Sequence, residues 1–264
     1  ADQTEVYFGI CGDEERYIPV VLAPEFEKLL EQSDAMYILS HPKLHYEQVR
    51  RALESGKHVL CESPIALKTQ DIKELVELAN EQKVILMEGI KTAYSTAFSR
   101  LILLLKGGII GKIVSVDAIC TSLKKDEDEW PGFYEWAPTA LIPVFQVLGT
   151  DYSEIKMISC LNESREEAFT KVDFLFEHAV ASIKVGNGVK AEGELIISGT
   201  KGYAYVPAPW WKTDYFEIRY EDQSQNKRYF YQLDGEGIRY ELVAFARSIE
   251  KRSNNSNIDT NISV

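Results

Sequence analysis

Residues 35–64 read AMYILSHPKLHYEQVRRALESGKHVLCESP, and this stretch predicts one strand–helix–strand unit. Ala35–Leu39 is a short apolar run that is typical of a strand buried on both faces. Pro42 suits the first turn of a helix, and Gly56 suits the position just past its end. Lys57–Cys61 reads as a second short strand. The two strands are therefore expected to run parallel, joined by a right-handed crossover.

The loops that leave these two predicted strands form the expected binding site. Ser40-His41-Pro42 follows the first strand, and Glu62-Ser63-Pro64 follows the second. In open parallel sheets, ligands bind outside the carboxyl ends of the strands. Both loops are therefore expected to face one crevice.

The composition limits the partners that this chain can take. Its 264 residues carry a net charge of −12, which argues against binding to nucleic acid or to an anionic membrane. No apolar run approaches the length of a membrane span, and no signal peptide opens the sequence. The cysteines are far apart in the sequence, at Cys11, Cys61, Cys120 and Cys160. This spacing predicts no metal site, and the three cysteines that lie in apolar strand-like runs are interpreted as buried thiols in a reducing cytoplasm.

Strand and helix signals alternate in the first part of the chain. They comprise a strand at Glu5–Ile10, a helix opened by Pro24, a helix with Thr69 as its N-cap, a strand at Val84–Met87 and a helix at Thr96–Lys106. This order predicts a parallel sheet with helices on both faces. A dinucleotide-binding domain normally opens with a G-x-G-x-x-G turn after a strand. No such turn occurs in residues 1–64.

After Gly111 the pattern changes to a succession of strands. A long strand at Lys112–Leu123, a charged loop at Lys124–Glu129 and an apolar helix over 136–149 come first. Seven strand-like segments follow, at Glu154–Leu161, Thr170–Glu177, Ala179–Val185, Ala191–Ser198, Gly202–Val206, Tyr215–Tyr220 and Arg228–Leu233. A helix at Ile238–Lys251 and a frayed end at Ser253–Val264 close the chain. The pattern predicts a large mixed or antiparallel sheet, whose uncovered face favours a homo-oligomer.

A series of short motifs in this order resembles the Gfo/Idh/MocA family of NAD(P)-dependent oxidoreductases. A small residue-x-Pro with a His three residues later is matched by Ser40, Pro42 and His45. The family's G-K-H-V strand and its Glu-Lys-Pro loop are matched by Gly56–Val59 and by Glu62–Pro64, with Ser63 in place of the lysine. Further matches are Met87–Tyr94, Gly108–Ile113, Phe133-x-Glu135, Pro143–Gly149, Val185–Gly193, Gly199–Tyr203, Pro209–Thr213 and Glu217–Glu221.

The resemblance implies an α/β fold with two domains. Residues 1–94 would form a Rossmann-like parallel-sheet domain, and residues 95–264 an α+β domain with a large open, mostly antiparallel sheet. Glu5–Ile10 resembles the family's second strand, so the first βαβ unit is expected upstream of residue 1. Asp13 is then the candidate for reading the ribose hydroxyls. In the family, NAD or NADP exchanges hydride with a hydroxyl-bearing carbon of a small sugar-like or polyol substrate.

Two positions depart from the family's catalytic pattern. The active-site lysine is Ser63 here, and the tyrosine of a Phe-x-Glu-x-x-x-Tyr pattern falls on Thr139. Neither side chain titrates near neutral pH, so neither suits acid–base work. Lys91 and Tyr94 follow another strand exit and are candidates to replace them. A solvated lysine and a packed tyrosine are the alternatives.

The other candidates also have two interpretations each. The resemblance implies that Glu62 contacts the nicotinamide ribose, whereas a helix cap or a surface acid is the alternative. It implies that His45 pins its loop through a backbone hydrogen bond. Candidates for a substrate pocket are Glu135, Trp210, Trp211 and Lys212. For the two tryptophans, core or interface packing is the alternative.

The sequence leaves two functions open. The first is an NAD(P)-dependent oxidoreductase, which the retained crevice motifs favour. The second is a catalytically silent relative that binds a ligand or serves as an assembly subunit, which Ser63 and Thr139 favour.

Overall fold

The computed structural model of the chain describes residues 26–123, 132–162, 167–233, 237–254, 256–258 and 263. The chain divides into two compact units, residues 1–86 and 87–264. Four predicted features lie outside the described residues: the strand Glu5–Ile10, the helix start at Pro24, the candidate Asp13 and the loop Lys124–Glu129. A division into domains after residue 94 remains a prediction.

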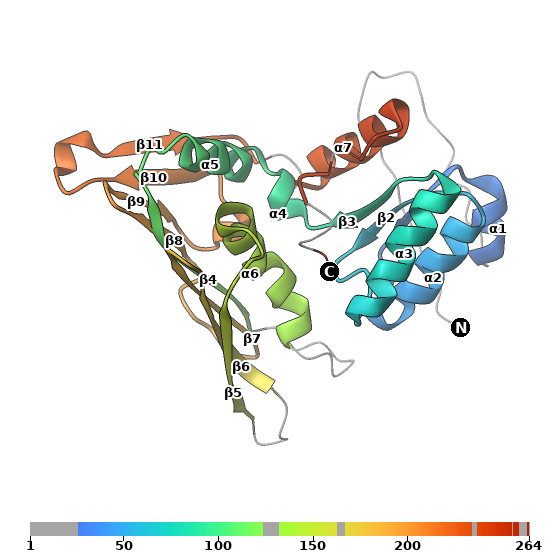
Figure 1. Ribbon diagram of the computed structural model, residues 1–264, viewed down its shortest axis with the longest axis horizontal. Helices are drawn as coiled ribbons and strands as arrows, with labels where there is room; N and C mark the ends of the chain where they lie inside the picture. Colours follow the sequence, from blue (N-terminus) through green and yellow to red (C-terminus); the bar gives the residue numbers. More distant parts are fainter. Residues whose placement is uncertain are drawn as a thin grey trace. The chain divides into compact units, whose positions relative to one another are not determined.

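The smaller sheet contains the predicted strand–helix–strand unit. Its strand order is β1-β2-β3, with β3 at Leu86–Gly89 (Figure 1). β1 (Ala35–Ile38) and β2 (His58–Glu62) pair in parallel, with Tyr37 opposite Leu60. The parallel pairing predicted from residues 35–64 is confirmed.

The third strand begins later than the predicted start at Val84. The Val84 amide donates a hydrogen bond to the Ala79 carbonyl (3.0 Å), so it still closes the preceding helix. That helix, Thr69–Gln82, ends at Lys83, which has a left-handed backbone conformation with φ +58°. Local helix capping therefore takes two residues that the apolar pattern assigns to the strand.

The described part of the first unit, residues 26–86, contains the helices α1 (Phe26–Gln32), α2 (Pro42–Glu54) and α3 (Thr69–Gln82). α2 begins at Pro42 as predicted, and Gly56 follows its end with φ +70°. The N-cap predicted at Thr69 is wrong by one residue. Lys68 is the N-cap, because its backbone is extended while its carbonyl already accepts from the Ile72 amide (3.2 Å).

The second unit is built on an eight-stranded sheet of order β11-β10-β9-β8-β4-β7-β6-β5. Its strands are β4 (Ile113–Ser122), β5 (Glu154–Leu161), β6 (Glu167–Leu175), β7 (Val180–Asn187), β8 (Leu195–Gly199), β9 (Tyr203–Val206), β10 (Tyr215–Arg219) and β11 (Lys227–Phe230). β4 and β7 pair in parallel, whereas the other neighbouring strands of this sheet pair antiparallel. The predicted mixed, mostly antiparallel sheet is confirmed.

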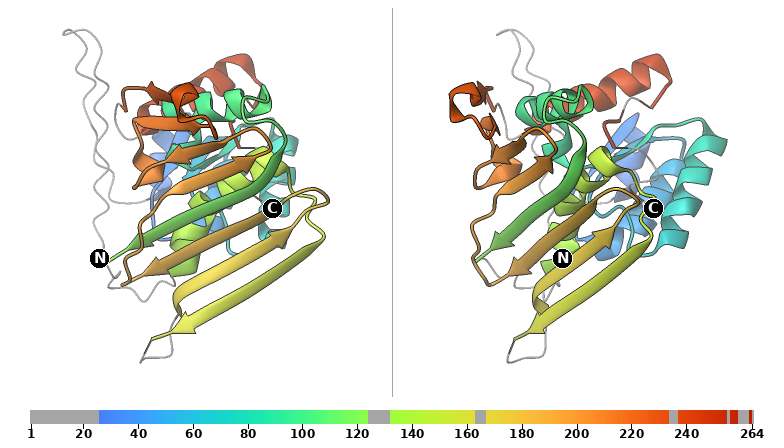
Figure 2. Two further views of the ribbon diagram at one scale, coloured as in Figure 1. Left: turned by 90° about the vertical axis from the view of Figure 1, so that its left-hand side faces the viewer. Right: turned by 60° about the vertical axis from the view of Figure 1, so that its left-hand side comes forward.

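Helices cover one face of this sheet. Figure 2 shows α5 (Thr96–Lys106) and α6 (Gly132–Leu148) on that face and the opposite face open. α6 packs against β4, β6 and β7, and the strand residues beneath it, such as Val116, Ile183 and Val185, are fully buried. The unit also contains α4 (Lys91–Tyr94), α7 (Ile238–Lys251) and the short 3₁₀ turns η1 (Trp210–Lys212) and η2 (Gln223–Gln225).

α6 starts four residues before the predicted helix over 136–149. The first turn of the helix, at Gly132, lies directly against Asn187. A Cβ added to Gly132 would be 2.8 Å from the backbone nitrogen of Asn187. Only glycine permits this approach, so a contact distant in sequence sets the start of the helix.

The sequence predicted a frayed end after α7, but the described residues there are not wholly frayed. The Asn257 side chain donates to the Ala93 carbonyl (2.9 Å), and Gln146 donates to the Asn257 carbonyl (2.8 Å). Ile258 is 5% exposed. These contacts hold the described residues 256–258 against α4 and α6, because polar side chains there find backbone partners.

Candidate functional site

The two predicted binding loops lie at the same edge of the smaller sheet. Ser40-His41-Pro42 leaves the carboxyl end of β1, and Glu62-Ser63-Pro64 leaves that of β2. The parallel register places these two ends side by side. This is the edge at which open parallel sheets bind ligands.

His45 joins the two loops. Its ring is 1% exposed. Nε2 lies 2.7 Å from the Ser40 carbonyl oxygen, and Nδ1 lies 2.8 Å from the Pro64 carbonyl oxygen. The sequence predicted one backbone hydrogen bond from this ring, and the structure has a contact on each side of it.

Tyr37 positions the Glu62 carboxylate. The Tyr37 hydroxyl donates a hydrogen bond of 2.5 Å to Glu62 Oε1. Tyr37 pairs with Leu60, two residues before Glu62, so the two side chains project from the same face of the sheet. Sequence reasoning missed Tyr37, although strand alternation across a parallel pair points to it.

The first loop is fixed by its own side chains. Ser40 donates a 2.5 Å hydrogen bond to Gln48 Oε1, in the second turn of α2. His41 is the N-cap of α2, and its Nδ1 accepts from the Lys43 amide (3.2 Å). The His41 contact satisfies one of the free backbone amides at the start of α2. In the second loop, Ser63 is half-buried and precedes Pro64 through a cis peptide bond.

In the second unit, Tyr94 is buried and already bonded. It is 4% exposed, and its hydroxyl lies 2.7 Å from Ser256 Oγ. Burial raises the pKa of Tyr94 well above its ordinary value. These features describe a packed tyrosine. Lys91, the other candidate of this helix, is half-buried, and its carbonyl lies against Gly237, which has φ +96°.

A polar and aromatic cluster surrounds the start of α6. Trp136 Nε1 donates to Asn187 Oδ1 (2.8 Å), and the Asn187 amide donates to the exposed carboxylate of Glu135. The Trp136 and Trp211 rings lie 5.0 Å apart. Thr139 is half-buried, one helical turn beyond Glu135. The sequence analysis identified Glu135 and Trp211 but missed Trp136 and Asn187. Trp136 lies in α6 outside any motif, and Asn187 is the last residue of β7.

The remaining aromatic candidate is a core residue. Trp210 is fully buried, and its indole nitrogen donates to the Ile119 carbonyl (3.1 Å). Its ring packs against Phe98 at 6.0 Å between centroids. Lys212, two residues later, is exposed. Of the Trp210-Trp211-Lys212 run, the first residue thus contributes packing and the last faces solvent.

Metal-binding groups and membrane-spanning helices are considered for the residues that the structure describes. No group of three or more His, Cys, Asp or Glu side chains there has the geometry to hold a metal ion. Among the same residues, no helix combines the length and apolar character that a membrane span requires.

Comparison with known proteins matches the chain to one family. Residues 13–90 fit the Gfo/Idh/MocA model, described as an oxidoreductase family with an NAD-binding Rossmann fold. The scyllo-inositol 2-dehydrogenase (NADP(+)) of Bacillus subtilis is 43% identical over 68 residues, which are 26% of this chain and 21% of that protein. The dTDP-3,4-didehydro-2,6-dideoxy-alpha-D-glucose 3-reductase of Streptomyces violaceoruber is 32% identical over 106 residues, 39% of this chain and 31% of that protein.

A solved structure has the same fold along most of the chain. The 3-ketoreductase of Actinomadura kijaniata, in complex with TDP-benzene and NADP, matches with a TM-score of 0.79 at 20% identity. The match covers 90% of this chain and 78% of that one. The curated relatives named above are matched over less than a third of their own length.

Proposed function

We propose that this chain, whose residues 13–90 fit the Gfo/Idh/MocA oxidoreductase model, serves NAD(P)-dependent hydride transfer on a sugar-like or polyol substrate. The observation that supports this most is the pair of loops at the carboxyl ends of β1 and β2, joined through His45. They occupy the ligand-binding edge of a parallel sheet. Two of the relatives, by their names, are an inositol dehydrogenase and a sugar 3-reductase, so one acts on a polyol and the other on a sugar.

We propose that the residues of the two loops hold the dinucleotide. Ser40, His41 and Pro42 would hold one side of the cofactor, and Glu62, Ser63 and Pro64 the other. The Tyr37 hydrogen bond fixes one oxygen of the Glu62 carboxylate, and a fixed carboxylate suits the hydroxyls of a ribose. The bound nicotinamide would supply or accept the hydride.

In the second unit, we propose that the start of α6 binds the substrate. There the Glu135 carboxylate is held by Asn187, next to the Trp136 and Trp211 rings. A positioned carboxylate can bind hydroxyl groups, and aromatic faces can pack on the apolar face of a sugar ring. This combination fits a polyhydroxylated substrate, with Lys212 as a further candidate at the exposed end of the tryptophan pair.

Proton transfer is the weakest part of the site. Ser63 and Thr139 stand where the family has its lysine and tyrosine, and neither titrates near neutral pH. The Tyr94 hydroxyl is buried and bonded to Ser256, which leaves Lys91 as the candidate acid–base group. These observations support the second candidate function, a catalytically silent relative that binds a ligand or serves in an assembly.

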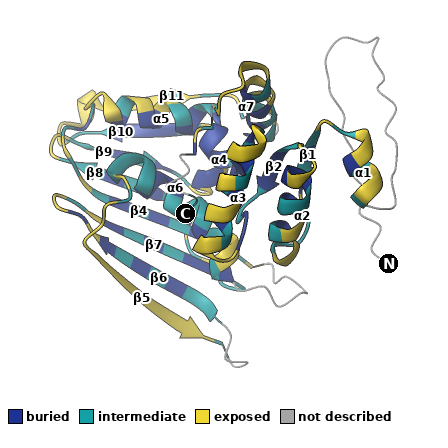
Figure 3. Cartoon of the chain, turned by 45° about the vertical axis from the view of Figure 1, so that its right-hand side comes forward, coloured by how far each residue is buried: buried dark blue, intermediate teal, exposed yellow. Residues whose placement is uncertain are grey.

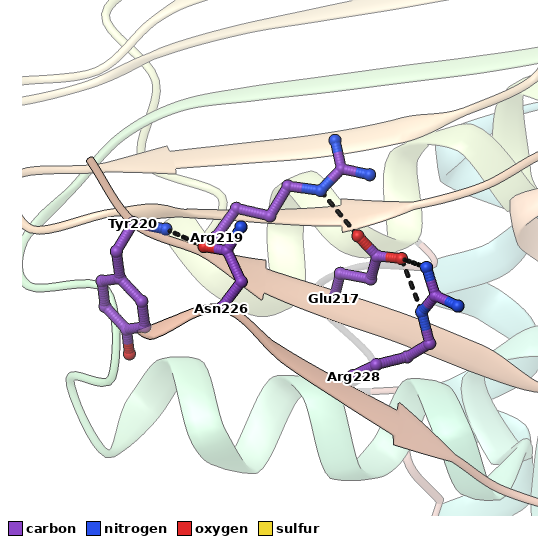
Figure 4. A network of polar contacts seen from close by, with 5 residues as sticks. All are labelled: Glu217, Arg219, Tyr220, Asn226 and Arg228. Carbon is purple, nitrogen blue, oxygen red and sulfur yellow. Dashed lines mark hydrogen bonds and ion pairs between the residues drawn. The ribbon is translucent and has the colours of Figure 1, made fainter. Parts of the chain in front are cut away.

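We further propose a homo-oligomer in a reducing cytoplasm, formed through the open face of the large sheet. A hollow of about 460 Å³ on this face is lined by acidic and basic side chains, among them Asp117, Lys156, Lys171, Asp173 and Lys184. At the other end of the face, Glu217 lies between Arg219 and Arg228 (Figure 4). The Arg219 guanidinium lies 4.3 Å from the centre of the Tyr205 ring.

Arginine and tyrosine are enriched in protein interfaces, where other charged side chains lie mainly at the polar rim. Leu175 and Val180, 41% and 50% exposed, add apolar area on the same face. A monomer mass in light scattering of the full-length protein would count against this assembly. The buried free thiols of Cys61 and Cys120 support the reducing compartment.

The function is tested by following nicotinamide absorbance with the full-length protein and a panel of sugars and inositols. Under the proposal, NAD(P)-dependent turnover appears with at least one of them and is lost in Lys91→Met. Lys201→Met is the matched control, because Lys201 is exposed in the turn between β8 and β9. Absence of any turnover, with cofactor binding retained, would favour the silent relative.

A further inference from the structure

We propose that Asn187 is a positioning residue of the substrate site. It holds the Glu135 carboxylate so that this group accepts hydroxyl hydrogens from a neutral sugar or polyol ring, in preference to an acidic sugar. The inference rests on the proposed function and deepens it by naming the substrate class. All the residues that carry it belong to the second unit.

Asn187 lies at a fixed point of the large sheet. It is the last residue of β7, where it pairs with Ser122 of β4. The next residue, Gly188, donates a backbone hydrogen bond to the Ser122 carbonyl (2.8 Å). A side chain that starts from a sheet is held more precisely than one that starts from a loop. The backbone therefore sets where the Asn187 side chain begins.

The first turn of α6 packs against this side chain. A Cβ added to Gly132 would be 2.9 Å from Asn187 Cβ and 3.1 Å from Asn187 Cγ. Packing this close leaves the asparagine little rotational freedom. Its amide group makes hydrogen bonds to the two following polar side chains of the helix, Glu135 and Trp136.

The hydrogen-bond partners decide which way the amide faces. Trp136 Nε1 can only donate, so the atom that it meets at 2.8 Å is the amide oxygen of Asn187. The amide nitrogen then faces the Glu135 carboxylate and donates to Oε2. Exchanging the two amide atoms would set N–H against N–H and oxygen against oxygen. Aspartate at this position could therefore serve Trp136 but could not donate to Glu135.

This bond gives the Glu135 carboxylate a fixed direction. Oε2 is bonded to Asn187, while the residue as a whole is exposed to solvent. A carboxylate accepts hydrogen bonds, which suits the hydroxyl groups of a sugar or polyol. A second carboxylate about 4 Å away would meet a like charge, and the repulsion would cost about fivefold in affinity even at the dielectric constant of water. The geometry therefore favours a neutral ring over an acidic one.

The two tryptophans supply an apolar surface beside this carboxylate. Trp211 is 9% exposed, and its ring lies against Gly193, where an added Cβ would be 3.3 Å from the ring. Trp136 is half-buried and packs on Trp211, with 5.0 Å between the ring centres. Trp211 thus supports Trp136, the neighbour of Glu135 in the chain. A ring compound with an apolar face and hydroxyl groups at its edge matches this pair of surfaces.

A purely structural role is the alternative for Asn187. In that role the amide only ties the end of β7 to the start of α6, and its loss would lower stability without affecting the choice of ligand. Sugar affinity in a pair of linked substitutions separates the two roles.

The test is nitrogen-15 NMR of the tryptophan indole groups in the 264-residue chain, with glucose, myo-inositol and glucuronate as probes. Trp136→Phe assigns its own signal among the four tryptophans. We expect the neutral rings to shift the Trp136 signal. Glucuronate differs from glucose only in a carboxylate in place of CH₂OH, and it should bind at least about fivefold more weakly.

Asn187→Asp keeps the oxygen that Trp136 needs and removes the donor to Glu135. Affinity for the neutral rings should therefore fall about tenfold or more, the effect of losing a hydrogen bond to a charged group. In Glu135→Gln/Asn187→Asp, the new amide can donate to the new carboxylate and keep its own oxygen turned outward. This double variant should bind the neutral rings more tightly than Asn187→Asp alone.

Asn226→Asp is the matched control. Asn226 Oδ1 also accepts a hydrogen bond, from the Tyr220 amide (2.8 Å), but it lies in the turn between β10 and β11. Sugar affinity should not change in this variant. If Asn187→Asp does not fold, Glu135→Gln tests the same claim, because it removes the charge and leaves an oxygen for Asn187. The preference for glucose over glucuronate should then disappear.

A double variant that binds no better than Asn187→Asp would refute the positioning role, and equal wild-type affinities for glucose and glucuronate would refute the selectivity. An unmoved Trp136 signal beside measurable NAD(P)-dependent turnover would overturn this inference and leave the proposed function standing. An unmoved signal together with no turnover and no cofactor binding would refute the proposed function itself. The two failures are thus distinguishable.

Discussion

Replacing Tyr94 by phenylalanine separates a structural tyrosine from a catalytic one. The structure shows a buried ring, 4% exposed, whose hydroxyl makes a 2.7 Å hydrogen bond to Ser256. Removing the hydroxyl leaves the ring packing unchanged and breaks that one bond. We expect a loss of about 1 kcal/mol in the free energy of unfolding, the typical net worth of such a bond. For a chain of this size, that lowers Tm by about 2–4 °C.

The partner provides the control. Ser256→Ala breaks the same bond from the other side, so we expect a similar loss and, in Tyr94→Phe/Ser256→Ala, less than the sum of the two. The assay is urea unfolding of the wild type, both single variants and the double variant. Turnover of the full-length protein, where measurable, should change less than about threefold in Tyr94→Phe. A fall by the 10²–10⁴-fold typical of a lost acid–base group, with Ser256→Ala unaffected, would refute the structural assignment.

Three further outcomes are expected. Burial alone would raise the pKa of Glu217, but hydrogen bonds and charge from Arg219 and Arg228 lower it below its ordinary value. The stability that Glu217 gains from the two arginines is therefore present at neutral pH and is lost as the pH falls below about 4. Glu217→Gln should cost about 1–2 kcal/mol at neutral pH, with a deficit in urea unfolding that shrinks in acid; a deficit constant with pH would contradict this. If the family's usual mechanism holds without a substitute for its lysine, Ser63→Lys should raise turnover of the full-length protein by about 10²–10⁴-fold, and adding Thr139→Tyr should raise it further; if Lys91 already serves as the acid–base group, the rate should stay nearly unchanged. The 264 residues contain no G-x-G-x-x-G turn, so calorimetry should show weak NADH binding, and a sub-micromolar dissociation constant would be the contrary result.

Local signals in the sequence were enough to predict the smaller sheet. Pro42 and Gly56 mark the ends of α2 because each has a conformational preference of its own. The placement of the loops after β1 and β2 at one edge of the sheet could be predicted from the parallel pairing of these strands alone. Where the prediction was wrong, as at β3, a helix-closing hydrogen bond from Val84 competes with an apolar pattern that extends one element into the next.

Contacts between residues distant in sequence were beyond prediction. The early start of α6 depends on Gly132 packing against Asn187. The Tyr94 hydroxyl meets Ser256, which comes from a polar segment that composition alone marks as a loose end. The two-sided contact of His45 could be named as a backbone pin, but its second carbonyl became visible only in the folded loop. Such partners are set by the fold and leave no periodic signal.

Exposure also divides the larger sheet in a way that the sequence did not predict. Every residue of the edge strand β5 is exposed (Figure 3). The strand nevertheless carries apolar side chains, such as Ile155 and Met157, at 55% and 47% exposure. An apolar run in the sequence therefore predicted the strand correctly but gave no sign that it lies at a sheet edge.

The central claim is that the loops after β1 and β2 hold a nicotinamide dinucleotide. The most direct measurement is an NMR titration of the 264-residue chain with NADPH, which detects even weak binding. We expect backbone amide shifts concentrated at residues 40–45 and 62–63, with no change at the turn over residues 199–202. Amides at the two loops that do not move at saturating NADPH, or shifts confined to the second unit, would contradict the account.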